Sequence, residues 1–334
     1  MLNEFRQDPV SGEWVLFATQ RARKPAPSTA SMLKMDKESC PFENPQEKGN
    51  EAPLLIFSHG KQAADLTDWT TQVFRNKFPA LQYGICGPIS VGPLFSTAVG
   101  YGFHELVVTR DHDRHFSSFT AAETAEVLTV YRERYRAIAT DQCGDYIAIF
   151  HNHGYLAGAS VYHNHSQIIS VPFVPPMIVR DIDRAGAYFR TSGTRIHESV
   201  LAQELQEGKR VVFQNDRFAA ICSYTSRVPY EIRIYPKYHQ PYFADISDAD
   251  VTACGEVLQT ALARLDKVTG NADYTFLVHT APPGEAKPEY DAFRWHIEII
   301  PRVTMPAGFE TSTNVYINVV DPDQAAEELR TATV

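Results

Sequence analysis

Features of membrane and secreted proteins are scarce in this 334-residue sequence. No apolar run approaches the roughly 18–20 residues that span a bilayer, and the opening residues MLNEFRQDPV lack the basic start and apolar core of a signal peptide. The five cysteines are an odd number and widely scattered, which is typical of reduced thiols rather than of a disulfide framework. We expect a cytoplasmic protein without a membrane partner.

Positive charge is also limited. The chain has 31 Lys and Arg against 40 Asp and Glu, a formal charge of −9, and no block rich in Lys or Arg. This balance argues against a nucleic-acid partner and against binding to anionic membranes. It still allows a local cationic pocket for a phosphate ligand. Hydrophobic residues at 44% and charged residues at 21% are ordinary for a globular protein.

An internal repeat is the first strong feature of the chain. Four pairs of positions or short segments match in the same order, with offsets of 126 to 131 residues. Chance could produce one such match, but four in order indicate a duplication. The pairs are Glu105 with Glu231, His112 with His239, 145–151 with 273–279, and 163–169 with 294–300.

Each half is predicted to contain a strand, a helix and two further strands. Apolar residues recur at helical spacing in 121–139 and 247–268, and each of these segments begins beside a residue suited to cap a helix. Segments 145–150 and 273–278 are rich in β-branched and aromatic residues, as strands are. Strands arranged around a single helix favour antiparallel α+β halves over a regular βαβ alternation.

The segment 152–167 has the densest group of chemically active residues. Small residues in its middle let a backbone approach a ligand closely, and 162–171 is predicted to form a strand. Because alternate residues of a strand share a face, His163, His165 and Gln167 are expected to point the same way.

This pattern suits phosphoryl transfer. A neutral imidazole can attack an α-phosphorus and form a covalent nucleotidyl-histidine, provided that its second nitrogen is held by an acceptor. A Gln amide two residues further on can donate to the non-bridging phosphate oxygens. The alternative is a purely structural strand whose two histidines only form internal hydrogen bonds. The His-x-His-x-Gln pattern directly after a Gly-Ala-Ser loop argues against this alternative.

The His-x-His-x-Gln pattern, the duplication and the N-terminal segments 8–16 and 21–25 resemble the galactose-1-phosphate uridylyltransferase family, the transferase branch of the histidine-triad superfamily. The resemblance covers nearly the whole chain. It implies an α+β fold of two tandem histidine-triad-like repeats, with antiparallel sheets and helices packed on them. The implied division is an N-terminal half, 1–180, that carries the motif, a connecting segment, 181–210, and a catalytically degenerate C-terminal half, 211–334.

The resemblance also implies roles for individual residues. His165 would be the nucleophile that carries the nucleotidyl group, and Gln167 and Ser160 would bind phosphate oxygens. The other implied substrate-binding residues of this half supply charge, nucleotide contacts or close backbone approach: Arg21, Lys24, Asn76, Asn152, Gly158 and Ala159. The alternative without a function is that Arg21 and Lys24 are solvated surface residues. Asn76 and Asn152 would then only occupy turns.

A structural zinc site is implied as well. Relatives hold zinc with a Cys-x-x-Cys pair and two histidines, but here Glu43 stands where the second Cys would be. The implied ligands are Cys40, Glu43, His112 and His163, a set that is acceptable for tetrahedral Zn²⁺. Cys40 could instead be a buried small hydrophobe, and His115 is a competing ligand.

Some relatives carry a second metal, for which His279 and His296 are retained and Asp181 is a candidate carboxylate. Arg294 stands where another histidine ligand is expected, so the sequence leaves a second metal open and we assign none. With Arg294 and Glu298 in place of the first half's His and Gln, the second half is expected to be catalytically silent.

The substrate pair is left open by the sequence. Phe309 and Glu310 match a motif that contacts the hexose in the uridylyltransferases, but the downstream Gln of that family is missing at 315–318. The resemblance implies that a nucleoside monophosphate, with uridylyl as the first choice, moves between a nucleotide sugar and a hexose 1-phosphate. The relatives called ADP-glucose phosphorylases, which pass adenylyl to phosphate, are the alternative.

Two further functions compete with nucleotidyl transfer. Histidine-triad nucleotide hydrolases typically carry a third His where this chain has Gln167. A zinc- or nucleotide-binding regulator would bind without turnover, and the intact pair of His165 and Gln167 argues against it. The resemblance implies a homodimer whose sites are completed by both chains.

Overall fold

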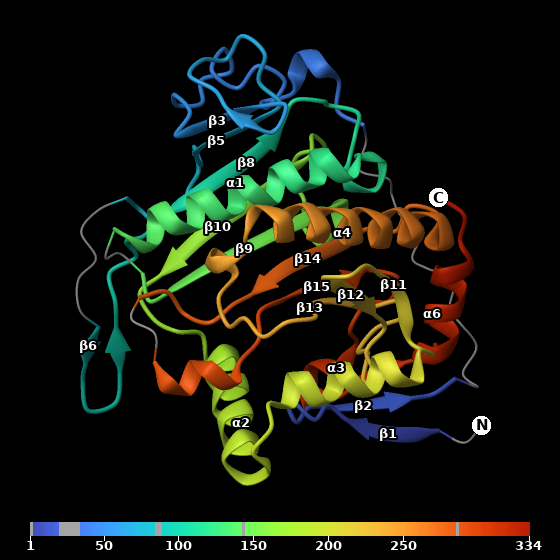
Figure 1. Ribbon diagram of the computed structural model, residues 1–334. Coiled ribbons are helices and arrows are strands. Elements are labelled where there is room, and N and C mark those ends of the chain that lie inside the picture. The colour runs from blue at the N-terminus through green and yellow to red at the C-terminus, as the bar shows by residue number, and fades with distance from the viewer. Residues whose placement is uncertain (1–2, 20–33, 84–88, 142–143, 285–286) are drawn as a thin grey trace.

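The computed structural model describes residues 3–19, 34–83, 89–141, 144–284 and 287–334 (Figure 1). Arg21 and Lys24, both predicted to bind substrate, lie outside the described residues. Within the described ranges, no helix is long and apolar enough to cross a membrane.

An eleven-stranded antiparallel sheet forms the centre of the described chain. From one edge to the other its strands are β11 (Val211–Gln214), β12 (Phe218–Ile221), β13 (Ile232–Pro236), β15 (His296–Pro301), β14 (Tyr274–His279), β9 (Tyr146–His153), β10 (His165–Val171), β8 (His104–Thr109), β5 (Thr71–Arg75), β3 (Leu55–Ser58) and β4 (Lys61–Gln62).

The strand order repeats outward from the central pair of β9 and β14. On one side β10, β8 and β5 follow, and on the other β15, β13 and β12 follow in the equivalent sequence positions. A duplicated strand–helix–strand–strand unit related by a two-fold axis produces this order, and the predicted fold class is confirmed. The sheet and the largest apolar core both run across the two halves, and the division at 180 and 211 stays a prediction.

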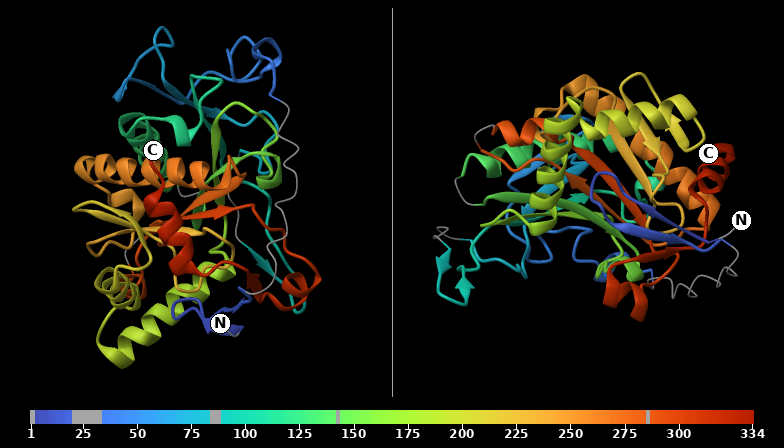
Figure 2. Two further views of the ribbon diagram at one scale, coloured as in Figure 1. Left: turned by 90° about the vertical axis from the view of Figure 1, so that its right-hand side faces the viewer. Right: turned by 90° about the horizontal axis from the view of Figure 1, so that it is seen from below.

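Helices α1 (Ala121–Ala139) and α4 (Asp248–Thr269) lie side by side on one face of the sheet (Figure 1; Figure 2, left). Thr120 and Ser247 each accept a hydrogen bond from the backbone N–H three residues further on, and such caps contribute about 1 kcal/mol each. Both helices bury an apolar stripe in the main core, as the helical spacing of their apolar residues predicted.

Gly255 on α4 lets the two helices approach closely. A methyl group at this position would lie 2.8 Å from the backbone nitrogen of Ala125 and 2.9 Å from the backbone oxygen of Ala121. Backbone atoms cannot move aside as the end of a flexible side chain can, so this crossing requires glycine.

The predicted connecting segment is mostly helical, with α2 (Pro176–Ser192) and α3 (Ile196–Glu207). A small sheet joins the two ends of the chain, because β16 (Tyr316–Asn318) pairs with β2 (Trp14–Phe17), which also pairs with β1 (Glu4–Gln7). The remaining elements are the hairpin of β6 (Ser90–Val91) and β7 (Ser96–Thr97), α5 (Gly308–Thr313), α6 (Pro322–Thr331) and the 3₁₀ turns Lys37–Ser39, Phe116–Ser118, Tyr155–Ala157, Phe243–Asp245 and Pro288–Ala292.

Candidate active site

Strand β10 divides its side chains between the two faces of the sheet. Ser166 is hydrogen-bonded by the Tyr131 hydroxyl of α1, and Ile168 enters the main core, so both face the helices. His165 and Gln167 alternate with them and therefore face the opposite side, away from α1 and α4.

One cavity of about 320 Å³ contains both of these side chains. Asn76 and Ser160, two of the predicted substrate-binding residues, line it as well. The rest of its wall comes from neighbouring segments of the first half: Pro41, Phe42, Lys48, Asn50, Lys77, Phe78, Leu106 and Val161.

The ring of His165, the predicted nucleophile, is held in its neutral form. Its side chain is nearly buried, with 6% of the residue exposed, and Phe42 packs against the ring with 5.1 Å between centroids. Nδ1 donates a hydrogen bond to the carbonyl oxygen of His163 at 2.9 Å, which leaves the lone pair on Nε2. Burial lowers the pKa of His165, against a smaller opposing effect of this hydrogen bond, so the neutral form is favoured at pH 7.

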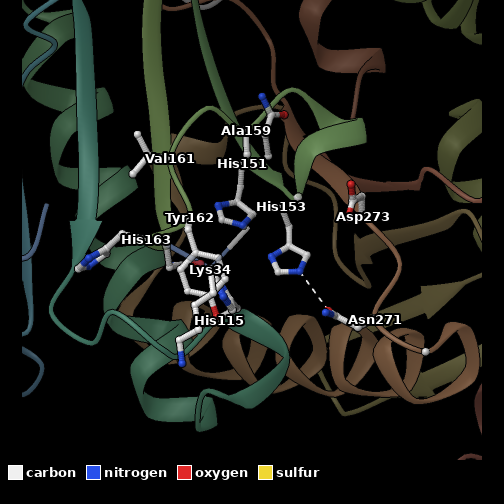
Figure 3. Close-up of a pocket in the computed structure, with 14 residues that line it drawn as sticks. Lys34, His115, His151, His153, Ala159, Val161, Tyr162, His163, Asn271 and Asp273 are labelled. Carbon is white, nitrogen blue, oxygen red and sulfur yellow. Dashed lines mark hydrogen bonds between the residues drawn. The ribbon is translucent and has the colours of Figure 1, made fainter. Parts of the chain in front are cut away.

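Two predicted substrate residues line a second cavity instead. Asn152 and Ala159 border a space of about 320 Å³ beyond the β9–β10 loop, which Figure 3 shows with His115, His151 and His153 around it. His151 donates from Nδ1 to the carbonyl oxygen of His165 at 2.9 Å. This histidine therefore supports the start of β10, at His165.

Three further predicted residues lie outside both cavities. Gly158 ends the turn Tyr155–Ala157 with a φ of 85°, in the left-handed region that favours glycine. Phe309 and Glu310 belong to α5, where the Glu310 carboxylate accepts a hydrogen bond from the backbone N–H of Ala307 and caps the helix. Their predicted contact with the hexose stays a prediction.

Three of the four predicted metal ligands come together behind the His165 cavity. Cys40, His112 and His163 are all buried, and their ligand atoms lie within 4.8 Å of one another, the only such group found in the described part of the chain. Glu43 Oε2 lies 3.6 Å from His112 Nδ1 and is buried without a hydrogen-bond partner. His115 instead packs edge-on against His153 in the second cavity.

The hydrogen bonds of the two histidines leave their lone pairs facing each other. His112 donates from Nε2 to the Met35 carbonyl at 2.7 Å, and His163 donates from Nε2 to the Thr109 carbonyl at 2.6 Å. Both Nδ1 atoms then carry lone pairs, yet they lie 3.3 Å apart. Burial lowers the pKa of His163 to about 4, so an extra proton does not relieve the contact. Two lone pairs, a thiol and an unpaired carboxylate oxygen are the donor set that a tetrahedral metal ion requires.

The second half repeats the histidine but not the cavity. Nδ1 of His296 lies 3.1 Å from the carbonyl oxygen of Arg294, the same arrangement as in the first half. Glu298 forms ion pairs with Arg227 and Arg233. These residues and His296 line a cavity of only about 40 Å³. The expected catalytic silence of this half stays a prediction.

Several residues that line the cavity of His165 were not predicted from the sequence. Lys48 and Lys77 bring two positive charges to its wall, and Phe42 and Phe78 bring two aromatic rings. The low overall content of basic residues gave no sign of them, because they come from separate segments. His104, which contacts Gln167 from the neighbouring strand, was missed for the same reason.

The duplicated fold and the His-x-His-x-Gln strand define a histidine-triad protein of the transferase type. The family model described as Galactose-1-phosphate uridyl transferase, N-terminal domain, matches residues 1–175, and a Domain of unknown function (DUF4921) matches residues 101–333. The chain belongs to the galactose-1-phosphate uridylyltransferase family.

Curated relatives match over nearly the full length. ADP-glucose phosphorylase of Arabidopsis thaliana is 29% identical over 98% of this chain and 92% of its own length, and galactose-1-phosphate uridylyltransferase of Thermotoga maritima is 27% identical over 98% of both chains. The crystal structure of an Arabidopsis thaliana ADP-glucose phosphorylase with bound ADP-glucose has a TM-score of 0.82 at 27% identity and covers 100% of both chains. These relatives support nucleotidyltransferase or phosphorylase activity.

Proposed function

We propose that the chain transfers a nucleoside monophosphate from a nucleotide sugar to a phosphate-bearing acceptor through a covalent intermediate on His165. The observation that carries this proposal is the free Nε2 of a buried, neutral His165 in the cavity that Gln167 and Ser160 also line. A nucleophile, a donor amide and space for a phosphate lie together there, as nucleotidyl transfer requires.

In the first step the Nε2 lone pair of His165 attacks the α-phosphorus of the nucleotide sugar. The N–P bond forms while the bond from phosphorus to the bridging oxygen breaks, and the sugar 1-phosphate leaves with that electron pair. The proton stays on Nδ1, where the carbonyl of His163 stabilises the positive charge that the ring gains. In the second step an acceptor phosphate oxygen attacks phosphorus, and the N–P electron pair returns to Nε2.

For the substrate pair we favour ADP-glucose as donor and inorganic phosphate as acceptor. The ADP-glucose phosphorylase of Arabidopsis thaliana matches this chain over nearly all of both proteins. The missing Gln at 315–318 favours the same reaction. Uridylyl transfer from UDP-glucose to a hexose 1-phosphate is the second candidate, supported by the uridyl transferase family model and by the Thermotoga maritima relative.

Positive charge for the diphosphate would come from two sources. Lys48 and Lys77 line the cavity of His165, and Arg21 and Lys24 are proposed to add to them. Side-chain donors at these positions would offset the negative charge that the α-phosphate oxygens carry during transfer.

The metal centre is proposed to hold zinc through Cys40, Glu43, His112 and His163. Four protein ligands would fill a tetrahedral site, so the ion would be structural rather than catalytic. Burial raises the pKa of the Cys40 thiol, and a bound cation would favour the thiolate. Such an ion would link the segment around Cys40 to His163, two residues before β10 begins.

The active form is proposed to be a homodimer with shared sites. Phe309 in α5 is 44% exposed and lies outside the His165 cavity of its own chain, so it is available to a second copy. The β6–β7 hairpin exposes Val91, Leu94 and Phe95 at 79%, 85% and 82%. Exposed apolar residues in such a group are typical of a protein–protein contact.

The test is to trap the intermediate. The protein is incubated with α-³²P-labelled ADP-glucose or UDP-glucose and no acceptor, and we expect an acid-labile label on the wild type that inorganic phosphate discharges as ADP. His165→Gly should take no label. His59→Gly is the matched control, because His59 is exposed and already has a positive φ of 46°. Equal labelling of His165→Gly would refute the assignment, and faster labelling by UDP-glucose would select the second candidate.

A further inference from the structure

Three polar side chains from adjacent strands form a row on the face that carries His165. Asn76 follows β5, His104 begins β8, and Gln167 lies in β10. The backbone N–H of Asn76 donates to the His104 carbonyl, and His104 lies opposite Ile169, two residues beyond Gln167. Strand register therefore brings the three side chains together although they are far apart in sequence.

The hydrogen bonds of His104 define its tautomer. The backbone N–H of Ala80 donates to Nδ1 at 2.9 Å, so Nδ1 carries a lone pair and Nε2 carries the proton. Nε2 lies 2.8 Å from Oε1 of Gln167. The imidazole therefore donates to the amide oxygen. The reversed amide would place an NH₂ group against an N–H, where neither can accept.

We propose that His104 is a positioning residue that orients the Gln167 amide, so that its NH₂ group faces the phosphate oxygens in the cavity. This inference rests on the proposed nucleotidyl transfer. An unrestrained amide can present either its NH₂ or its carbonyl oxygen to a ligand, and the oxygen would repel a phosphate. With Oε1 accepting from His104, the two N–H donors are directed elsewhere, and His165 and Gln167 share one cavity.

The same tautomer affects Asn76. Its Oδ1 accepts from the backbone N–H of Phe78 at 2.9 Å, and its Nδ2 lies 3.0 Å from Nε2 of His104. Because that ring nitrogen is protonated in this tautomer, it cannot accept from Asn76, and the 3.0 Å contact joins two donors. The His104 ring therefore orients the Gln167 amide and gives the Asn76 side chain no hydrogen bond.

The experiment is a double-mutant cycle on the labelling step. The rate of His165 labelling by ADP-glucose is measured by rapid quench in the wild type, His104→Phe, Gln167→Ala and the double variant. His104→Phe should lower the maximal rate about 10- to 100-fold with little change in the half-saturating concentration. In the Gln167→Ala background the same substitution should change the rate less than about two-fold, because the amide that it orients is gone.

Two further variants separate positioning from structural support. His104→Gln keeps both a donor and an acceptor and should recover part of the lost rate, while His59→Phe at an exposed position should leave the rate unchanged. An equal loss from His104→Phe in both backgrounds, or no loss in the wild-type background, would overturn the proposal.

A second measurement does not depend on activity. Long-range ¹H–¹⁵N NMR of histidine-labelled protein reports which ring nitrogen is protonated. We expect the Nε2–H tautomer for His104, and a Nδ1–H tautomer would refute the positioning role. If the wild type takes no label while His104 shows the expected tautomer, nucleotidyl transfer fails and the amide orientation stands.

Discussion

The carbonyl oxygen of His163 accepts the Nδ1 hydrogen bond of His165 at 2.9 Å, while the His163 ring faces Cys40 with 3.5 Å between Nδ1 and Sγ. A single residue thus belongs to both centres. Its ring belongs to the predicted set of metal ligands, and its backbone carbonyl selects the tautomer of His165, the predicted nucleophile. A change at the metal ligands should therefore reach the reacting nitrogen without touching the substrate.

Removing the proposed Cys40 ligand should reduce zinc binding and also slow the reaction at His165. Cys40→Ala is expected to lower bound zinc from about one ion per chain to well below one, and to slow His165 labelling about 10-fold or more, as changes around a metal site commonly do. Metal content is measured by atomic emission on the same samples. Cys254→Ala is the control, because Cys254 is equally buried but lies in the main core. Unchanged zinc in Cys40→Ala would contradict the proposed site.

Glu43 is expected to be the weak member of the ligand set. Glu43→Cys would complete a Cys-x-x-Cys pair, and thiolate is a stronger ligand for zinc than carboxylate. We expect zinc release to a chromogenic chelator to slow in Glu43→Cys and to accelerate in Glu43→Gln. His115→Gln should release zinc at the wild-type rate, because His115 packs against His153 and not against the ligand group. Faster release from His115→Gln would make His115 the ligand instead.

The face that β10 presents was predictable from sequence, whereas the cavity was not. Alternation along a strand is a local property, so His165 and Gln167 could be placed on one face from their spacing alone. Phe42, Lys48 and Lys77 reach the same cavity through folding of separate segments. No local pattern reports such an approach, because it depends on how β5, β8 and β10 align.

The central pairing of β9 and β14 shows the same limit. The repeat at offsets near 128 residues predicted two similar halves. The structure joins them into one sheet through the antiparallel pairing of β9 with β14, with five strands beyond β9 and four beyond β14. Antiparallel register between distant segments follows from packing of the whole sheet. His104 was missed for this reason, since its contact with Gln167 exists only in the observed register of β8 and β10.

Stability should fall in acid partly because of His197 in α3. This side chain is 2% exposed, neither ring nitrogen has a hydrogen-bond partner, and burial, aided by the charge of Arg294, lowers its pKa to about 3. As the pH falls, the folded state therefore binds this proton at a lower pH than the unfolded state, whose histidine has a pKa of about 6.5. The contribution to stability is complete above pH 6.5 and is lost as the pH falls from 6.5 toward 3, by about 2 kcal/mol at pH 5.

The check compares urea unfolding at pH 7 and pH 5. His197→Phe keeps a ring of similar size but cannot bind the proton, so the drop in unfolding free energy between the two pH values should be smaller by about 2 kcal/mol. A drop equal to that of the wild type would show that His197 does not contribute to the acid response.

Close approach of α1 and α4 should make Gly255 intolerant of a methyl group. Gly255→Ala gains about 1 kcal/mol of helix propensity, but its Cβ would lie 2.8 Å from a backbone nitrogen, and overpacking of this kind costs about 1–3 kcal/mol. We expect a net loss of stability, seen as a lower midpoint in thermal and urea unfolding. Gly186→Ala in α2 is the control, since its Cβ would meet only the flexible end of Arg190 at 3.2 Å, and it should be neutral or stabilising.

Shared sites in a homodimer can be tested by complementation between two defective variants. His165→Gly removes the proposed nucleophile, and Phe309→Ala removes the exposed aromatic ring that is available to a second copy. Each variant alone should be nearly inactive in full turnover. In each heterodimer one site carries both defects and the other carries neither, so the purified heterodimers should regain about half of the wild-type sites. Mixing is achieved by co-expression with two different tags and purification over both. A single site built entirely within one chain would give no activity above the sum of the two variants, and light scattering of each variant separates this outcome from a failure to dimerise.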